Sequence, residues 1–477
     1  MKLLRAVSVV CLCLLAALSA SAQTWTPVTS LPTFSPGTAL MLTDGRVLVQ
    51  DSDASDWWTL TPDLTGSYVN GTWTQVASLQ SNYGPLYYAS EVLPDGRVVV
   101  IGGEYNFGSG VWTTQGAIYQ PTTNKWANLM APTGWNTVGD AQSVILPGGT
   151  FMLANCCTSQ EALLNAKTLK WTSTGTGKHD SNDEEGWTLL PNGQVLTVDA
   201  NCGTCDYSEI YDPATGDWTA AGSTVVDLVD QGSHELGPAV LRPDGTVIYI
   251  GATGHNAVYN TVTSQWSAAA DFPKNQQNQQ LDVADGPAAL LPDGNVLTFT
   301  SPGVYKTGGQ FFEWDGTNWN PTVNVPNGPG DSSYYGRMLE LPTGQILFTD
   351  GSSDVEIYTP TGAANPSWAP TITKFSKTLT HGKSSNLRGT QLNGLSQGAA
   401  YGDDAQMASN YPLVRITNTG TGHVFFARTY DFTMGVATGS AIAKTKFQVP
   451  AGIELGASQL EVVTNGIASN PVSVTIK

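Results

Sequence analysis

A short turn motif recurs seven times along most of this chain, and it limits the possible folds more than any other feature. Each copy lies between two apolar runs and ends in glycine: Thr43–Gly45, Pro94–Gly96, Pro147–Gly149, Pro191–Gly193, Pro243–Gly245, Pro292–Gly294 and Pro342–Gly344. Successive copies are 44 to 53 residues apart. Proline presets φ and glycine supplies a positive φ, so each copy predicts a tight turn between two strands.

Each repeat also has the composition of several short strands. Val98–Ile101, after the second turn, is a continuous β-branched run, as expected of a buried strand. Each repeat closes on a tryptophan: Trp73, Trp126, Trp171, Trp218, Trp266, Trp319 and Trp368. A period near 50 residues with about four strands predicts propeller blades, because one blade cannot bury both faces of its sheet alone. Seven repeats predict a seven-bladed ring.

The two ends of the repeated region define the predicted domains. Trp25-Thr-Pro-Val28 resembles the segment that follows later tryptophans, so we expect the N-terminus to add an outer strand to the last blade. After Trp368 the period stops, and strand-like runs continue to the end of the chain. The predicted fold is therefore all-β, with a β-propeller over residues 23–370 and an immunoglobulin-like β-sandwich over residues 371–477.

The first 22 residues have the composition of a signal peptide. Lys2 and Arg5 precede the apolar run 6–18, and Ala20-Ser21-Ala22 forms a small-residue cleavage site. A membrane anchor is the alternative, but the apolar run is short for a span. We therefore expect a secreted or periplasmic protein with no membrane association after cleavage.

The net charge limits the partners of the chain. It is −18 for the whole sequence and −20 once Lys2 and Arg5 are removed. Such an acidic surface disfavours nucleic acid and anionic membranes. We expect a monomer that binds a carbohydrate or glycan rather than a polyanion.

Four cysteines remain after the signal segment: Cys156, Cys157, Cys202 and Cys205. In an oxidising compartment an even number predicts disulfides, and four cysteines allow three pairings. These include a vicinal Cys156–Cys157 bridge and a small loop closed by the other two. A zinc site is disfavoured in an exported protein.

The seven turns also locate a candidate site, because in a propeller the innermost strands begin at one mouth. Counting eight residues back from the middle of each turn crosses the first strand and keeps the same face of the sheet, since eight is even. This step reaches Pro36, Tyr87, Asp140, Glu184, Leu236, Asp285 and Tyr335. Neighbouring residues add Ser35, His234, Glu235, Tyr334 and Arg337.

The predicted mouth is acidic and rimmed by tyrosines, which suits a sugar ligand. As a hydrolase, the protein would use an acid–base pair from Asp140, Glu184, Glu235 and Asp285. As a lyase, it would move the proton with His234 and Tyr87 or Tyr335, while Arg337 binds a substrate carboxylate. The alternative is that these groups only bond backbone amides of the channel. The acidic run 179–185 is expected to be a solvated loop, apart from Glu184.

The repeats resemble the kelch repeat in their turns, in Gly102-Gly103 and in the Tyr…Trp endings of the blades. With the edge motifs at 389–397 and 463–471, nearly all of the mature chain resembles the galactose oxidase family in its architecture. The resemblance implies a copper ion at the mouth, held by two tyrosines and two histidines. One histidine would come from a C-terminal loop. One tyrosine would be cross-linked to cysteine and shielded by an aromatic ring.

Several positions match this family pattern. Tyr87 fits the cross-linked tyrosine, Tyr334 fits the axial tyrosine, and His423 fits the loop histidine. Other positions depart from the pattern. Tyr335 stands in place of a histidine ligand, Ser35 in place of the cysteine, and Tyr105 in place of the shielding tryptophan.

These departures decide which function the sequence favours. Ser35 cannot form a thioether, and an oxygen-rich ligand set suits copper poorly. The sequence therefore predicts a galactose oxidase-like protein that binds or processes carbohydrate at the mouth and requires no cofactor. One alternative is a copper-dependent carbohydrate or alcohol oxidase. Another is a non-enzymatic adhesion or protein-interaction module.

Overall fold

A computed structural model describes residues 22–203, 206–405 and 407–477, so the signal segment 1–21 lies outside the described residues. Apart from three short 3₁₀ helices, η1 (Gly328–Gly330), η2 (Ser333–Tyr335) and η3 (Pro366–Trp368), the regular structure within these residues is β-strand. No described helix has the length and apolar character needed to cross a bilayer.

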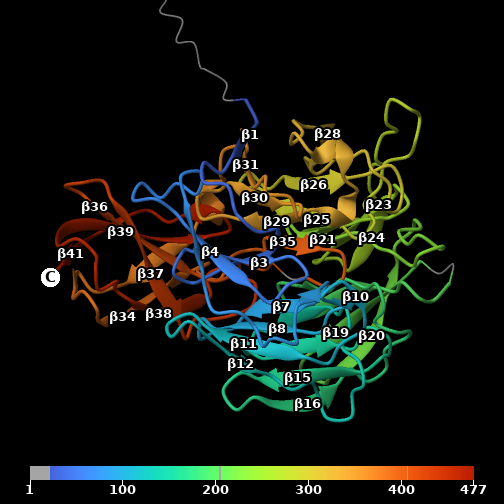
Figure 1. Ribbon diagram of the computed structural model, residues 1–477, viewed down its shortest axis with the longest axis horizontal. Helices are drawn as coiled ribbons and strands as arrows, with labels where there is room; N and C mark the ends of the chain where they lie inside the picture. Colours follow the sequence, from blue (N-terminus) through green and yellow to red (C-terminus); the bar gives the residue numbers. More distant parts are fainter. Residues whose placement is uncertain (1–21, 204–205, 406) are drawn as a thin grey trace, which may run out of the picture.

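Between residues 24 and 359 the described chain forms seven successive antiparallel sheets, each with four strands from this region (Figure 1). The first strands of the sheets are β2 (Pro36–Met41), β7 (Ala89–Val92), β13 (Ser143–Ile145), β17 (Thr188–Leu189), β21 (Ala239–Leu241), β25 (Pro287–Leu290) and β29 (Arg337–Glu340). The second strands are β3 (Val47–Asp51), β8 (Val98–Ile101), β14 (Phe151–Ala154), β18 (Val195–Val198), β22 (Thr246–Ile250), β26 (Val296–Thr300) and β30 (Ile346–Thr349).

The outer half of each sheet is built in the same way. The third strands are β4 (Trp57–Thr61), β11 (Gly116–Gln120), β15 (Glu161–Asn165), β19 (Tyr207–Asp212), β23 (Asn256–Asn260), β27 (Gln310–Trp314) and β31 (Glu356–Thr359). The outer strands are β5 (Thr72–Gln75), β12 (Lys125–Asn128), β16 (Lys170–Thr174), β20 (Asp217–Ser223), β24 (Gln265–Ala268), β28 (Trp319–Pro321) and β1 (Thr24–Pro27). A small separate sheet joins β6 (Pro85–Leu86), β9 (Tyr105–Asn106) and β10 (Ser109–Gly110).

The predicted turns between first and second strands are confirmed. The glycine of each motif has φ between 77° and 88°. Its N–H donates to the carbonyl three residues earlier, as in Gly96 to Leu93 at 2.8 Å. The β-branched run 98–101 of β8 is fully buried, as its sequence predicted.

The sheets surround a common axis, which is the arrangement of a β-propeller. Most neighbouring first strands contact one another: β2 contacts β7 and β29, β7 contacts β13, β17 contacts β21, and β25 contacts β21 and β29. The predicted pairing of the N-terminus is confirmed, because β1 pairs with β31 from Thr24↔Thr359 to Pro27↔Glu356. The last sheet is therefore completed by the first strand of the chain.

Each outer strand carries one tryptophan that forms a hydrogen bond toward the preceding sheet. The indole N–H groups donate across the gap between sheets, as in Trp126 to the carbonyl of Ala77 at 2.8 Å. The donors are Trp25, Trp73, Trp126, Trp171, Trp218, Trp266 and Trp319. Trp368 was predicted to end the seventh unit, and this is wrong. Because β1 takes the outer place there, Trp368 lies in η3 against the turn glycine Gly294.

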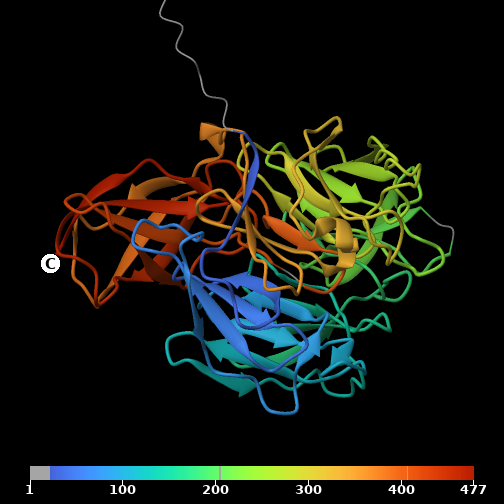
Figure 2. The ribbon, with the colours of Figure 1, turned by 45° about the horizontal axis from the view of Figure 1, so that its top comes forward.

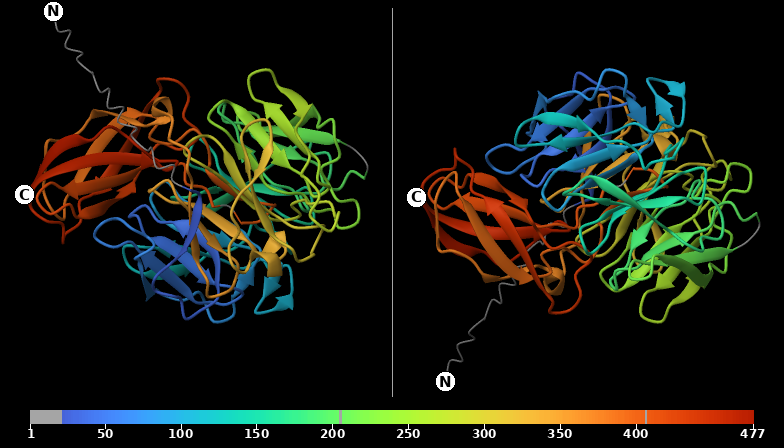
Figure 3. Two further views of the ribbon diagram at one scale, coloured as in Figure 1. Left: turned by 90° about the horizontal axis from the view of Figure 1, so that it is seen from above. Right: turned by 90° about the horizontal axis from the view of Figure 1, so that it is seen from below.

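The chain after residue 370 adds nine strands on one side of the ring (Figures 2 and 3). Eight of them pair in the order β32-β34-β38-β37-β36-β39-β41-β33, and β40 pairs with β39. Their bounds are β32 (Thr371–Lys374), β33 (Thr378–Leu379), β34 (Ser384–Thr390), β36 (Leu413–Asn418), β37 (Val424–Tyr430), β38 (Ile442–Gln448), β39 (Gly456–Thr464), β40 (Ile467–Ala468) and β41 (Val472–Ile476).

One further C-terminal strand leaves this group and enters the ring. Strand β35 (Ala399–Tyr401) pairs antiparallel with β25, the first strand of the sixth sheet, and lies among β21, β25 and β29 (Figure 1). The N–H of Leu290 donates to Gly398 at 2.6 Å, and the N–H of Gly402 donates to Gly286 at 3.2 Å. We call residues 396–411 the channel segment.

Hydrogen bonds that involve side chains fix the channel segment to several sheets. The Gln397 Oε1 accepts from the N–H of Leu189 at 2.8 Å, and the Tyr411 hydroxyl donates to the carbonyl of Met41. Glu340 of β29 accepts at Oε2 from the Ser409 hydroxyl at 2.6 Å. Burial raises the pKa of Glu340 to about 7, and its hydrogen bond with Ser409 lowers that pKa only in part.

The raised pKa of Glu340 predicts a pH-dependent stability. The folded protein binds this proton more tightly than the unfolded chain, so the stabilisation is complete below the unfolded pKa and is lost as pH rises through about 7. Glu340→Gln keeps an acceptor oxygen and should remove up to about 3 kcal/mol of the fall in unfolding free energy between pH 5 and pH 8. Denaturant unfolding at a series of pH values measures this difference.

The exposed Asp217→Asn serves as control and should keep the wild-type pH dependence. Equal slopes for wild type and Glu340→Gln would contradict the assignment.

Candidate functional site

The predicted site residues lie at corresponding places in successive sheets. Each comes just before the first strand of its sheet: Tyr87 before β7, Asp140 before β13, Glu184 before β17, Glu235 before β21, Asp285 before β25, and Tyr334 and Tyr335 before β29. The step of eight residues therefore reached a position just before the first strand in six sheets, and in the first sheet it reached Pro36, the first residue of β2. Because the first strands share one axis, these side chains approach the same mouth.

The backbone turns sharply at this position in several sheets. Tyr87, Glu184 and Asp285 have positive φ values of 52°, 58° and 54°. Gly139, just before Asp140, takes the same left-handed conformation with φ 71°. The turn is therefore a property of the fold, and the non-glycine residues hold it at a conformational cost of about 1 kcal/mol each.

Five carboxylates meet at the mouth in two groups of three. One oxygen from each of Asp140, Glu184 and Asp403 lies within 4.8 Å of the others, and the same holds for Glu184, Glu235 and Asp285. We call these groups the first and second carboxylate trios. Glu184 belongs to both trios and therefore links them.

Crowding and burial make these carboxyl groups hard to ionise. Burial, followed by the charge of Glu235, raises the pKa of Asp285 to about 8. Burial raises the pKa of Glu235 to about 7, although a hydrogen bond from Tyr305 opposes the rise. The pKa values of Asp140, Glu184 and Asp403 lie well above their usual range, first from burial and then from neighbouring carboxylates. Each proton lost at the mouth makes the next loss more costly.

Three important side chains were not predicted. Tyr401 and Asp403 belong to the channel segment, and Tyr305 follows β26. The Tyr401 hydroxyl donates to Asp285 Oδ2 at 3.3 Å, and the Tyr305 hydroxyl donates to Glu235 Oε1. The only sequence signal is the polar run Tyr401-Gly-Asp-Asp404, and no repeat spacing places it at the mouth.

Arg337 lies beneath the mouth. Its guanidinium carbon is 3.6 Å from the ring centre of Tyr401 and 5.2 Å from that of Tyr87. Its Nη1 donates to the backbone carbonyls of Tyr334 and Gly336 at 2.7 and 2.9 Å. Arg337 is buried, so this geometry differs from the predicted contact with a substrate carboxylate.

Aromatic side chains with exposed surface stand around the carboxylates. Tyr335 is 47% exposed and packs on Tyr334 with 4.3 Å between ring centres. Tyr305 is 58% exposed and meets Tyr334 edge to face. Tyr105 contacts the ring of Tyr87. Trp112 is 54% exposed and lies next to Gly139, on the side of the third sheet.

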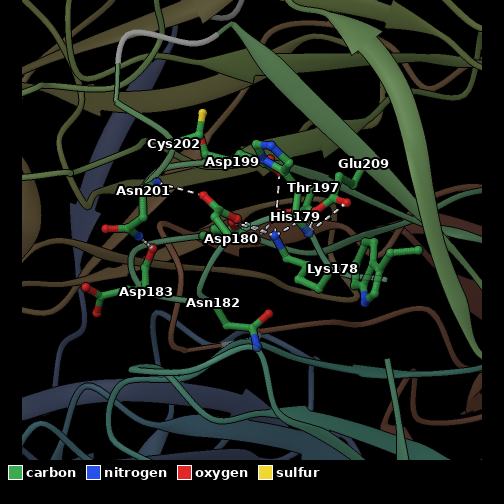
Figure 4. Close-up of polar contacts among 12 residues, drawn as sticks. Lys178, His179, Asp180, Asn182, Asp183, Thr197, Asp199, Asn201, Cys202 and Glu209 are labelled. Carbon is green, nitrogen blue, oxygen red and sulfur yellow. Dashed lines mark hydrogen bonds and ion pairs between the residues drawn. The ribbon is translucent and has the colours of Figure 1, made fainter. Parts of the chain in front are cut away.

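A buried lysine fixes the loop that carries Glu184 (Figure 4). Lys178 Nζ lies 2.7 Å from Asp180, 2.9 Å from Glu185, 2.8 Å from Glu209 and 3.5 Å from Asp199. Burial alone would lower the pKa of Lys178, but the four carboxylates raise it overall. We call these five residues the lysine cluster.

The lysine cluster corrects the expectation of a solvated loop at 179–185. Asp180 and Glu185, on either side of Glu184, are held by the buried ammonium group. Asn201 extends the anchor, because its Nδ2 donates to the carbonyl of Asp183 at 2.6 Å (Figure 4). The loop is therefore positioned from within the fold.

His423 is not brought to the mouth. Its Nδ1 lies 2.6 Å from Glu454 Oε1, and the N–H of the next residue, Val424, donates to the carbonyl of Leu64. The predicted loop histidine is therefore wrong, because the channel segment and not the β36–β37 turn enters the ring. His234 precedes β21, with Nδ1 3.3 Å from the carbonyl of Ala200.

Two of the cysteines lie near the mouth. The structure joins Cys156 and Cys157 in a vicinal disulfide, which is one of the predicted pairings. Cys156 lies against Gly139. The Cys202 sulfur is 3.9 Å from the carbonyl of Asp199, and Cys205 lies outside the described residues.

The residues at the mouth do not fit the copper set that the family resemblance implies. Among the described residues, none of the clusters able to hold a metal ion contains a histidine. Burial and the charges of Asp285 and Asp404 raise the pKa of Tyr87, although Arg337 opposes them, so its phenolate is disfavoured. Copper(II) prefers nitrogen donors, whereas the carboxylate trios supply only oxygen.

Comparisons with known proteins agree with the fold. No protein-family model matches the chain. "Kelch-like protein terF" of Aspergillus terreus is 28% identical over 119 residues, which are 22% of this chain and only 25% of that protein. This partial match agrees with the kelch character of the repeats.

Two solved structures illustrate the structural likeness. A fungal alcohol oxidase of the AA5 family, in complex with copper, has a TM-score of 0.54 and 13% identity over 96% of this chain and 100% of its own. A catalytically inactive virginiamycin B lyase from Staphylococcus aureus, with quinupristin, has a TM-score of 0.52 and 9% identity over 71% of this chain and 99% of its own. At these identities the likeness shows the fold alone.

The lysine cluster generates a stability prediction. Lys178→Met removes one charge and leaves four carboxylates buried without their cation, so it should lower the free energy of unfolding by about 3–5 kcal/mol. Thermal or denaturant unfolding at neutral pH measures the loss. Lys125→Met, at an exposed lysine of β12, is the matched control and should change stability little. Wild-type stability in Lys178→Met would show that the cluster does not hold the loop.

Proposed function

We propose that this protein binds a carbohydrate at the mouth of a kelch propeller and does so without a copper radical cofactor. The observation that carries the proposal is the set of partly exposed aromatic rings around the carboxylate trios. Pyranose rings stack on aromatic faces, and carboxylates accept hydrogen bonds from sugar hydroxyls. Tyr335, Tyr305 and Trp112 would provide the stacking faces.

The number of propeller blades and the fold of the C-terminal strands are also part of the proposal. We propose that the seven sheets over residues 23–370 are the blades of a seven-bladed ring and that residues 371–477 form an immunoglobulin-like sandwich. The contacts of β2 with both β7 and β29 and the pairing of β1 with β31 support the ring. The pairing order of β32 to β41 supports a second β unit.

Binding is favoured over the two catalytic interpretations. A lyase would need Arg337 for the substrate carboxylate, but this side chain is buried and donates to backbone carbonyls. A hydrolase needs two carboxyl groups with separate roles on either side of the scissile bond. Here five carboxylates crowd together in linked trios.

The proposed location is the cell exterior or the periplasm. The charged, apolar and small-residue segments of residues 1–22 have the order of a signal peptide. The vicinal pair of Cys156 and Cys157 suits an oxidising compartment. We also propose that the protein is a monomer.

The copper oxidase is the second candidate, because an AA5 alcohol oxidase in complex with copper shares the fold. We expect that copper-loaded protein releases no peroxide from primary alcohols or from galactose. Peroxide release that depends on copper, measured with a coupled peroxidase assay, would contradict the proposal and favour the oxidase.

Ligand binding at the mouth is tested by a glycan screen followed by calorimetry with the best ligand. Tyr335→Ala removes an exposed stacking face and should weaken binding roughly tenfold, the equivalent of about 1.4 kcal/mol. Trp112→Ala should act in the same direction.

Tyr430→Ala, in β37 of the C-terminal strands, is the control and should bind as wild type. Wild-type affinity in both mouth variants would favour the non-enzymatic interaction module, with a binding surface elsewhere. Absence of any bound glycan would remove the carbohydrate proposal.

A further inference from the structure

We propose that the mouth binds a hard divalent cation of the Ca²⁺, Mg²⁺ or Mn²⁺ class, with Glu184 as the ligand common to both carboxylate trios. The proposal goes beyond carbohydrate binding and does not require it. It concerns the carboxylate oxygen atoms of the two trios. We call the exposed rings of Tyr335, Tyr305 and Trp112 around them the aromatic rim.

The spacing of the oxygen atoms fits a common ion. Calcium lies 2.3–2.6 Å from its oxygen ligands, so two ligands of one ion are at most about 5.2 Å apart. The three oxygens of each trio lie within 4.8 Å of one another. Each trio could therefore share one ion after small side-chain movements.

Several oxygen atoms of the trios are buried without a hydrogen-bond donor. Asp140 Oδ1, Glu235 Oε2 and Asp403 Oδ2 have no such partner in the structure. The three residues are only 8%, 4% and 2% exposed. A buried polar atom without a partner is costly, and buried polar groups in folded proteins are nearly always paired. A cation would satisfy these oxygens together.

Once ionised, the carboxylates at the mouth also lack a charged partner. Within the described residues, no lysine, arginine or histidine forms an ion pair with Asp140, Glu184, Glu235, Asp285 or Asp403. The charge of Arg337 acts on Asp285, but the Arg337 side chain stacks on Tyr401 and donates to backbone carbonyls. Buried charges are normally paired or coordinate metals, so a divalent ion is the missing counter-charge.

The ligands come from five separate segments that the fold holds in place. Four precede first strands of neighbouring sheets, and Asp403 follows β35 in the channel segment. The loop of Glu184 is anchored by the lysine cluster. The site is therefore built into the ring.

The donor chemistry decides the class of ion. Carboxylate oxygens suit Ca²⁺, Mg²⁺ and Mn²⁺, whereas copper and zinc favour imidazole and thiolate. Calcium accepts six to eight oxygen ligands, so a trio leaves positions for water or for hydroxyl groups of a ligand. Such positions would face the aromatic rim.

Calorimetric titration of the chelator-treated full chain tests the site. Ca²⁺, Mg²⁺ and Mn²⁺ are added separately at pH 8 without sugar, up to about 10 mM, which exceeds the weakest usual calcium affinities. We expect saturable binding of at least one ion and a rise in unfolding temperature at saturation. Glu184→Gln should weaken binding at least tenfold, because both trios lose a charged ligand.

Glu161→Gln is the control, because Glu161 is a buried glutamate outside the trios, and the amide oxygen of the variant can still accept from Trp218. It should bind the ion as wild type does. Asp140→Asn and Glu235→Gln each change one trio, and at least one of them should weaken binding. They also keep the test valid if Glu184→Gln does not fold.

Two outcomes would overturn the cation site. One is the absence of saturable binding for all three ions. The other is wild-type affinity in the folded Glu184→Gln protein or in both single-trio variants. Because no sugar is present, neither outcome bears on carbohydrate binding, and a failed glycan screen leaves the cation result intact.

Discussion

Hydrogen bonds from tryptophan side chains join neighbouring sheets around the ring, and the geometry of the mouth depends on them. Each indole N–H reaches the preceding sheet or the segment that leaves it, as in Trp73 to Ser30 and Trp266 to Ser208. The large rings also fill the space between twisted sheets. With the outer strands fixed in this way, the first strands keep one common axis, and the residues before them converge.

Periodic features of the sequence predicted most of the ring and part of the site. The turn glycines fixed the hairpins, and an even step from them reached Tyr87, Asp140, Glu184 and Asp285. Long-range pairings escaped prediction, since no local signal encodes them. Asp403 reaches the mouth because β35 pairs with β25, more than 100 residues earlier in the chain. The same pairing explains why His423 was the wrong choice of loop residue.

The two acidic clusters of this protein differ in how the charge of their buried carboxylates is compensated. In the lysine cluster, the ammonium group of Lys178 compensates four buried carboxylates. At the mouth, none of the five carboxylates forms an ion pair with a lysine, arginine or histidine of the described residues. A buried lysine is a permanent counter-ion and suits a structural role. A site that lacks one can exchange protons or external cations with the solvent, which suits a role in binding.

Strand β35 makes the C-terminal strands inseparable from the ring. Without residues 399–401, the inner edge of β25 would present unpaired N–H and C=O groups to the channel. Such an edge is a template for pairing with another chain, so a ring cut free after residue 370 would be prone to self-association. The protein is therefore a poor source of a detachable propeller scaffold. The repeats and the C-terminal strands look like separate modules in the sequence, but the pairing of β35 with β25 joins them into one unit.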